Sequence, residues 1–217
     1  SRLQYLAFRE LKAAIELNKA KAGGIVVIDA ASGEILALAN WPTYNPNARN
    51  RVAREKMRNR ALTDVFEPGS TMKPFAVAAA LEAGTVGPAT VIQTGGGTLT
   101  IGPHTIHDAH PGGALTVEQV VQKSSNVGAA KIALGLPPET MWRTLAGSGF
   151  GTPPATGFPG EVSGRLRAPK TWKPLFPAME GAAVCRAAAA RQEMIRIRID
   201  KVHQGDRFTT RREHSPA

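Results

Sequence analysis

The chain has 217 residues, of which 42% are hydrophobic, and a formal net charge of +10 at pH 7. This length suits one well-cored domain, and no apolar run approaches the roughly eighteen residues that a membrane-spanning helix needs. The single cysteine, Cys185, excludes an internal disulfide and a cysteine-only metal site.

The first forty residues favour a helix followed by a hairpin. Apolar residues at mixed three- and four-residue spacing predict an amphipathic helix over residues 1–20, which Gly23-Gly24 is expected to end. Two apolar segments, 25–29 and 34–40, predict strands joined by a turn at 30–33. The sequence therefore predicts an antiparallel sheet covered by helices.

The stretch Glu-Pro-Gly-Ser-Thr-Met-Lys-Pro-Phe at residues 67–75 contains the pattern Ser-x-x-Lys. Ser70 and Lys73 lie one turn apart on a predicted helix, so they share a face. A serine hydroxyl is a poor nucleophile until a base takes its proton, and a lysine can be that base when burial or a nearby positive charge lowers its pKa. We therefore expect a nucleophile and its base at a helix N-terminus, where the helix dipole favours oxyanion charge.

The next segment contains two patterns that could suggest other chemistry. Gly95-Gly96-Gly97 lacks the Lys-Ser/Thr that follows in a phosphate-binding loop, so we interpret it as the approach to a hairpin, with a strand at 98–101. Four possible metal ligands follow, but no second cluster completes a site. We expect no metal there, and a polar loop over the mouth of an active site instead. These four residues are His104, His107, Asp108 and His110.

A second candidate motif, Ser124-Ser125-Asn126, lies on a predicted turn between two helices. Thr116 and Gln119 predict a capping box at the start of the first helix. The turn is expected to project Ser124 and Asn126 together. A short helix at 139–146 and a Gly/Pro-rich loop at 147–160 follow.

Ser-x-x-Lys followed by Ser-x-Asn is a pairing typical of penicillin-binding proteins and class A β-lactamases. With these motifs and five further short segments, the sequence resembles the division-specific class B penicillin-binding proteins, the septal peptidoglycan D,D-transpeptidases. The resemblance runs from about Leu3 to about Pro174. The further segments lie at residues 24–29, 33–39, 42–47, 59–61 and 157–161.

The resemblance implies a mixed α/β fold like that of serine β-lactamases, an antiparallel sheet with a helical subdomain, spanning a transpeptidase domain at residues 1–177. It implies that Ser70 attacks the penultimate D-alanine of a peptidoglycan stem peptide while Lys73 takes its proton. Ser124, close to Lys73, would relay a proton to the leaving nitrogen, and Asn126 would bind the substrate's backbone amide and help fix Lys73. β-Lactams would acylate the same serine, and no metal or organic cofactor is implied.

Full-length relatives lie at the periplasmic face of the bacterial inner membrane and work with other division proteins. They carry a membrane anchor and a non-catalytic domain that would precede Ser1. This chain shows neither a signal peptide nor a transmembrane segment, so we expect it to be a piece of a longer protein.

The chain departs from the family pattern in two places. The third motif, Lys-Thr/Ser-Gly on an edge strand, is absent, and Lys170-Thr171-Trp172 is the nearest string. Residues 178–217 form a divergent basic tail that is either disordered or contains a strand at 195–199, and a shifted reading frame or a truncated gene would explain it. The alternative function is therefore a catalytically inactive, C-terminally truncated family member or an interaction module that retains the fold.

The net charge also raises a nucleic-acid hypothesis. From Gly181 to Ala217, eight Lys and Arg stand against four Asp and Glu, whereas charges before this segment are scattered apart from a denser patch at 49–60. A tail-driven binder would lose affinity steeply with salt. Since no interleaving of aromatic and basic residues appears, we expect no nucleic-acid partner.

Overall fold

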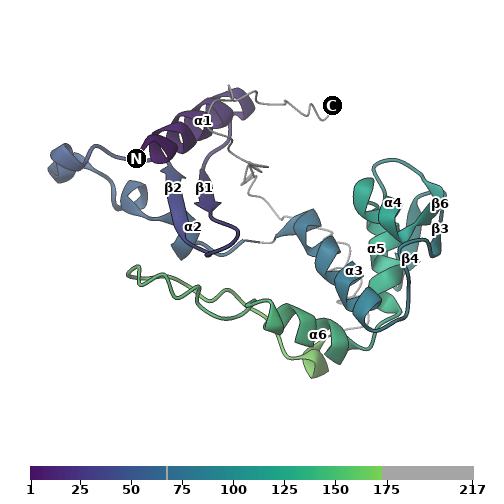
Figure 1. Ribbon diagram of the computed structural model, residues 1–217. Helices are drawn as coiled ribbons and strands as arrows, with labels where there is room; N and C mark the ends of the chain where they lie inside the picture. The colour runs from purple at the N-terminus through teal and green to yellow at the C-terminus, as the bar shows by residue number, and fades with distance from the viewer. Residues whose placement is uncertain (67, 173–217) are drawn as a thin grey trace. The chain divides into compact units, whose positions relative to one another are not determined.

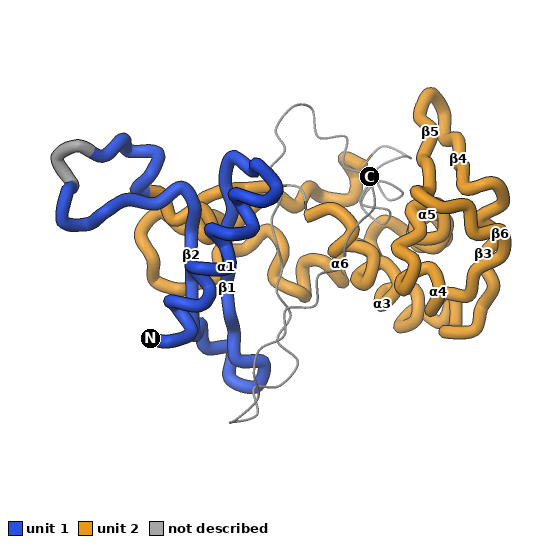
Figure 2. The backbone as a smooth tube through the Cα atoms, turned by 90° about the horizontal axis from the view of Figure 1, so that it is seen from above, with its two compact units in different colours: residues 1–57, 192–217 blue, residues 58–191 orange. Residues whose placement is uncertain are grey.

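The computed structural model describes residues 1–66 and 68–172 of the chain (Figure 1). The chain divides into two compact units, whose described parts are residues 1–57 and residues from 58 onward (Figure 2). Both contain helices and antiparallel strands, which confirms the predicted mixed α/β class. The predicted boundary at residue 178 and the tail beyond it lie outside the described residues. Within the described part, no helix is long and apolar enough to cross a membrane.

The first unit contains one long helix and a two-stranded antiparallel sheet: α1 (Arg2–Asn18), β1 (Gly23–Ile28) and β2 (Ile35–Trp41). Leu11 and Ile15 of α1 pack against the sheet in a small core. The helix ends at Lys19, whose backbone is left-handed at φ 51°, so the prediction that Gly23-Gly24 ends it is wrong. Gly23 begins β1 instead, and a Cβ there would lie 2.9 Å from the Cδ1 of Ile15, so glycine lets the strand approach the helix closely. Two 3₁₀ helices follow, η1 (Pro46–Arg51) and η2 (Arg54–Met57).

The second unit is a helical layer with two small sheets. Helices α3 and α5 pack together over buried alanines, because short side chains let helix axes come close, and α3 also contacts α6. Figure 1 shows α3, α4 and α5 gathered with β3 and β6. The elements are α2 (Arg60–Thr63), η3 (Gly69–Met72), α3 (Lys73–Glu82), β3 (Val91–Gly95), β4 (Thr98–Ile101), β5 (His104–His107), β6 (Gly113–Thr116), α4 (Val117–Gln122), α5 (Asn126–Leu134), α6 (Pro138–Gly147) and η4 (Pro169–Thr171).

The strands of this unit pair in an order that the sequence did not predict. β3 pairs with β6, and β4 pairs with β5, both antiparallel. The turn at Gly95–Gly97 therefore links two separate sheets and does not close a hairpin between β3 and β4. The partner of β3 arrives about twenty residues later, where Val91 lies opposite Thr116.

The predicted capping box at the start of α4 is confirmed. Thr116 Oγ1 accepts a hydrogen bond from the backbone N–H of Gln119 at 3.2 Å, and Gln119 Oε1 accepts one from the backbone N–H of Thr116 at 3.0 Å. The box fixes the start of α4, and the helix then leads directly into the turn that carries Ser124.

Gly128, on the first turn of α5, packs against α4 with no room for a side chain. A Cβ there would lie 2.5 Å from Val120 Cγ2 and 3.0 Å from Ser125 Oγ, and both neighbours are buried. We expect Gly128→Ala to lower the free energy of unfolding by about 1–3 kcal/mol, because overpacking forces its neighbours to shift. Urea unfolding monitored by circular dichroism measures this. Gly96→Ala is the control, since its Cβ would meet nothing within 4 Å; equal stability of the two variants would contradict the prediction.

Candidate active site

Ser70 lies in the 3₁₀ turn η3, directly before α3, and its side chain is exposed. The sequence predicted an α-helix beginning at the serine, whereas the α-helix begins at Lys73. Gly69 enters the turn with φ 65°, a left-handed conformation that glycine adopts without a steric cost. Pro74 occupies the first turn of α3, where its missing N–H needs no helical partner. The serine therefore stands at the N-terminal end of a continuous 3₁₀ and α-helical segment.

Lys73 is the most completely buried charged residue among the described residues, with 2% of its surface exposed. Its Nζ donates hydrogen bonds to the carbonyl oxygen of Ser124 at 2.5 Å, to Ser124 Oγ at 2.8 Å and to Asn126 Oδ1 at 2.6 Å. The structure thus brings together Lys73, Ser124 and Asn126, which are about fifty residues apart in sequence. No hydrogen bond between the described residues joins Lys73 to the hydroxyl of Ser70.

Burial lowers the pKa of Lys73 from 10.5 to about 8, and the nearby carboxylate of Asp108 partly opposes this by favouring the ammonium. Desolvation penalises the charged form of any amine, so the direction follows from the position of Lys73 in the apolar layer between α3 and α5. An amine with this pKa is neutral in roughly a tenth of the molecules at pH 7. It can therefore act as a proton acceptor at physiological pH.

Ser124 lies on the turn between α4 and α5, as predicted, and Asn126 is the first residue of α5. Ser124 has φ 54°, a left-handed conformation that is uncommon for a residue with a side chain and that functional sites often contain. Ser125 caps α5, because its Oγ accepts from the backbone N–H of Gly128 at 2.9 Å. With Ser125 turned inward as the cap, the residues on either side of it both face Lys73.

Sequence reasoning missed the part that Asp108 plays. This residue was considered as a metal ligand or as part of a polar loop, whereas its carboxylate accepts hydrogen bonds from Ser125, Asn126 and Val127. The carbonyl of the preceding residue, His107, accepts from Asn126 Nδ2 at 2.7 Å. In the sequence, the only sign of this role was that Asp108 lies in a loop before the Ser124-Ser125-Asn126 motif.

Two other sequence features remain, the possible metal ligands at residues 104–110 and the Lys170-Thr171-Trp172 segment. Within the described residues, no group of three or more His, Cys, Asp or Glu is arranged to hold a metal ion. Lys170 and Thr171 lie in the 3₁₀ helix η4, and the following Trp172 indole donates to the Arg167 carbonyl at 3.0 Å. This string therefore lies on a 3₁₀ turn and not on an edge strand.

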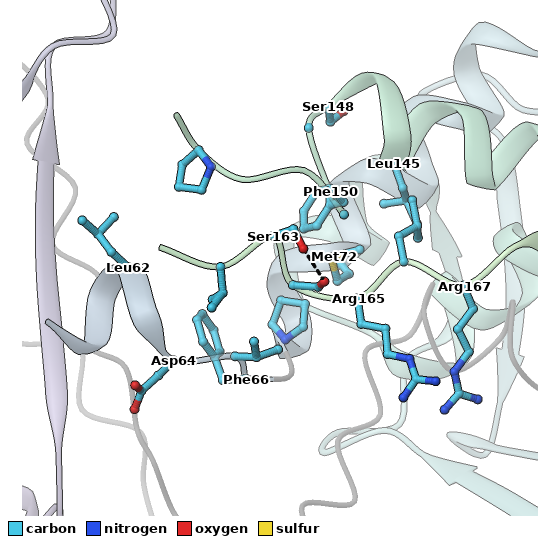
Figure 3. A pocket seen from close by; sticks show the side chains of 18 of the residues that line it. Leu62, Asp64, Phe66, Met72, Leu145, Ser148, Phe150, Ser163, Arg165 and Arg167 are labelled. Carbon is cyan, nitrogen blue, oxygen red and sulfur yellow. Dashed lines mark hydrogen bonds between the residues drawn. The ribbon is translucent and has the colours of Figure 1, made fainter. Parts of the chain in front are cut away.

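The second unit also contains a cavity of about 720 Å³, separate from the Lys73 cluster (Figure 3). Its walls come from residues 61–66, from Met72 and from the loop at 148–167. In Figure 3 the side chains of Arg165 and Arg167 lie side by side at one edge. The candidate residues Ser70, Lys73, Ser124 and Asn126 are not part of its lining.

Comparison with known proteins shows which family the chain belongs to. The family described as penicillin binding protein transpeptidase domain matches residues 23–205. The chain is 45% identical over 172 residues to a probable peptidoglycan D,D-transpeptidase PenA of Neisseria flavescens, covering 79% of this chain and 42% of that protein. It is 44% identical over 171 residues to the peptidoglycan D,D-transpeptidase FtsI of Escherichia coli K12, covering 79% of this chain and 29% of that protein.

The fold matches solved structures as well. The apo structure of the TP domain from Burkholderia pseudomallei penicillin-binding protein 3 superposes with a TM-score of 0.72 at 45% identity, covering 83% of this chain and 50% of that one. The chain spans less than half the length of the two curated relatives. The family match covers well over half of the chain. The chain therefore belongs to the penicillin-binding protein transpeptidase family, and the class B membership that its motifs indicated is confirmed.

Proposed function

We propose that this chain carries the acyl-transfer site of a peptidoglycan D,D-transpeptidase, with Ser70 as nucleophile and Lys73 as its base. The observation that carries the proposal is the buried amine of Lys73, which has a lowered pKa and bonds directly to Ser124 and Asn126. An amine in this state is suited to take a proton from a hydroxyl one helical turn away.

The reaction follows from these roles. As the Oγ of Ser70 attacks the carbonyl carbon of the penultimate D-alanine, its proton passes to Lys73. The bond between this carbonyl and the terminal D-alanine then breaks, and Ser124 relays the proton to the leaving nitrogen. An amine of a second stem peptide then attacks the resulting ester, the bond between the acyl carbon and Ser70 Oγ breaks, and the proton lost by the amine returns to Ser70 as the cross-link forms. A β-lactam would acylate Ser70 by the same first step, with its ring amide as the bond that breaks.

In this proposal the side chain of Asn126 binds substrate as well as Lys73. Its Oδ1 faces the amine while its Nδ2 donates to the His107 carbonyl, so both ends of the amide are fixed. We propose that it orients the backbone amide of the stem peptide. Lys73 bonds to Ser124 and Asn126 and not to Ser70, which fits a free enzyme, because catalytic hydrogen bonds often form only when substrate is bound.

The absence of the Lys-Thr/Ser-Gly motif is expected to lower the rate at which Ser70 is acylated. In relatives, that edge strand supplies one of the two oxyanion-hole amides. Losing one oxyanion donor lowers a rate on the order of a hundredfold or more. We therefore expect acylation that is slow but still specific to Ser70.

Intact-protein mass spectrometry after long incubation with benzylpenicillin tests the proposal. We expect a mass increase of one drug molecule on the 217-residue chain and none on Ser70→Ala. Ser163→Ala is a matched control, because this exposed serine lies in a loop outside the Lys73 cluster and is expected to leave the adduct intact. A folded chain without adduct would instead favour an inactive family member.

We further propose that the full-length protein acts with other division proteins at the periplasmic face of the inner membrane. The similarity to FtsI over most of this chain supports this. Co-purification of the full-length protein from detergent-solubilised membranes tests it.

A further inference from the structure

Asp108, in the loop after β5, holds the start of α5 with both of its carboxylate oxygens. Its Oδ1 accepts from the backbone N–H groups of Asn126 at 2.5 Å and Val127 at 2.9 Å, and its Oδ2 accepts from the Ser125 hydroxyl at 2.9 Å. The first N–H groups of a helix have no partner within the helix, and a negative charge beside them is favourable. A carboxylate about eighteen positions upstream therefore completes the cap that Ser125 begins.

This contact does more than cap a helix, because one of the three residues that it holds, Asn126, is a partner of Lys73, and another, Ser125, directly follows the second partner, Ser124. All three hydrogen bonds of the Lys73 amine go to Ser124 and Asn126. Ser124 has an unfavourable left-handed backbone, and such a conformation persists only where the surroundings enforce it. Asp108 fixes the residues immediately after Ser124, while the neighbouring His107 carbonyl turns the Asn126 amide so that Oδ1 faces the amine.

We propose that Asp108 is a positioning residue of the acyl-transfer site. Its carboxylate ties the end of the β4–β5 hairpin to the Ser124–Asn126 turn and thereby holds the hydroxyl and amide oxygens against Lys73. The inference rests on the proposed function for its effect on rate, but the contacts on which it stands are independent of that function.

Asp108 is also the charged group that acts on Lys73 among the described residues. The residues before and one turn after Lys73 in the chain are buried and apolar: Met72 of η3, and Ala76 and Val77 of α3. On α5, Lys131 donates to the Gln93 carbonyl at 2.6 Å. The side chain of Asp108 thus combines two effects that substitution can separate. Asparagine keeps an oxygen for the two backbone N–H groups but removes the charge, whereas alanine removes both.

Two measurements test the proposal. The first is the rate of Ser70 acylation by a fluorescent penicillin across about pH 6 to pH 9. We expect Asp108→Ala to lower the rate by about 10- to 100-fold, because small misplacements of a catalytic group are costly. Asp108→Asn is expected to keep a larger share of the rate and to move the midpoint of the pH profile downward, since the ammonium loses an attractive charge. A capping role alone would leave this midpoint in place.

The second measurement is a nitrogen-15 NMR titration of the Lys73 amine, assigned with Lys73→Met, which needs no reaction. We expect the midpoint to fall in Asp108→Asn and the signal to broaden or shift in Asp108→Ala. Asp29→Ala is the matched control, because Asp29 also accepts from two backbone N–H groups, those of Ala31 and Ser32, in a turn of the first unit. It is expected to change neither readout.

The outcomes separate the two proposals. If the unmodified chain is not acylated, the proposed function fails, and the titration alone decides the role of Asp108. If the chain is acylated but both Asp108 variants react within twofold of it, with an unshifted Lys73 titration, the positioning role is overturned. If Asp108→Ala and Asp108→Asn slow acylation equally and the midpoint of the pH profile does not shift, the positioning role is also overturned, and Asp108 acts only as a helix cap.

Discussion

Replacing Lys73 by methionine is expected to slow the acylation of Ser70 by benzylpenicillin on the order of a thousandfold, because general-base catalysis contributes about 10²- to 10⁴-fold. Methionine has nearly the length of lysine and suits the apolar layer around it, so the variant removes the base with little change in volume. Stopped-flow or quenched-flow measurement of the acylation rate constant near pH 8 gives the comparison.

Lys131→Met is the control for this experiment. Lys131 also donates to a backbone carbonyl, that of Gln93, but it is exposed and lies away from Ser70 in sequence. We expect it to react at the rate of the unmodified chain. A Lys73→Met rate within tenfold of that value would mean that another group takes the proton of Ser70.

The lowered pKa of Lys73 also predicts how stability changes with pH. Below about pH 8 the amine is protonated in the folded and unfolded states, and the cost of burying its charge is fully present. Between about pH 8 and 10.5 the unfolded chain holds more protons than the folded chain, so the free energy of unfolding rises with pH. The rise is about 3 kcal/mol over the whole window and about 2 kcal/mol by pH 9.5.

Urea unfolding at about pH 7 and pH 9.5 measures this rise. Other lysines and tyrosines titrate in the same range, so the quantity to compare is the difference between the unmodified chain and Lys73→Met. We expect the unmodified chain to gain about 2 kcal/mol relative to the variant. A constant difference between the two proteins would show that the amine is not desolvated in the folded state.

Local features of the sequence predicted much of the fold. The amphipathic spacing before residue 20 and the capping box at Thr116 both correspond to observed helices. Helix ends were less predictable, since Lys19 adopts a left-handed conformation that glycine normally takes. Likewise, the segment at Ser70 begins as a 3₁₀ turn, which is common at helix N-termini and leaves no mark in apolar spacing.

Contacts between residues far apart in the sequence explain the other features of the structure that the sequence did not predict. The pairing of β3 with β6 depends on strands about twenty residues apart, and apolar alternation gives no information on which strand is the partner. The two motifs predicted that Lys73, Ser124 and Asn126 meet. The role of Asp108 could not be predicted, because no sequence pattern around a single aspartate in a loop indicates which groups will donate hydrogen bonds to it.

The three hydrogen bonds of Lys73 have a consequence for the direction in which protons can travel. The charged amine has three hydrogens, and three oxygens accept them. When the amine loses a proton, one oxygen loses its donor, and the amine gains a lone pair. The carbonyl and amide oxygens can only accept, but the Ser124 hydroxyl can rotate and donate to that lone pair. The 2.8 Å contact between Ser124 and Lys73 then reverses its polarity while the heavy atoms stay in place. In the proposed mechanism this contact can therefore carry a proton in either direction, and the charge of Lys73 sets which of the two groups donates.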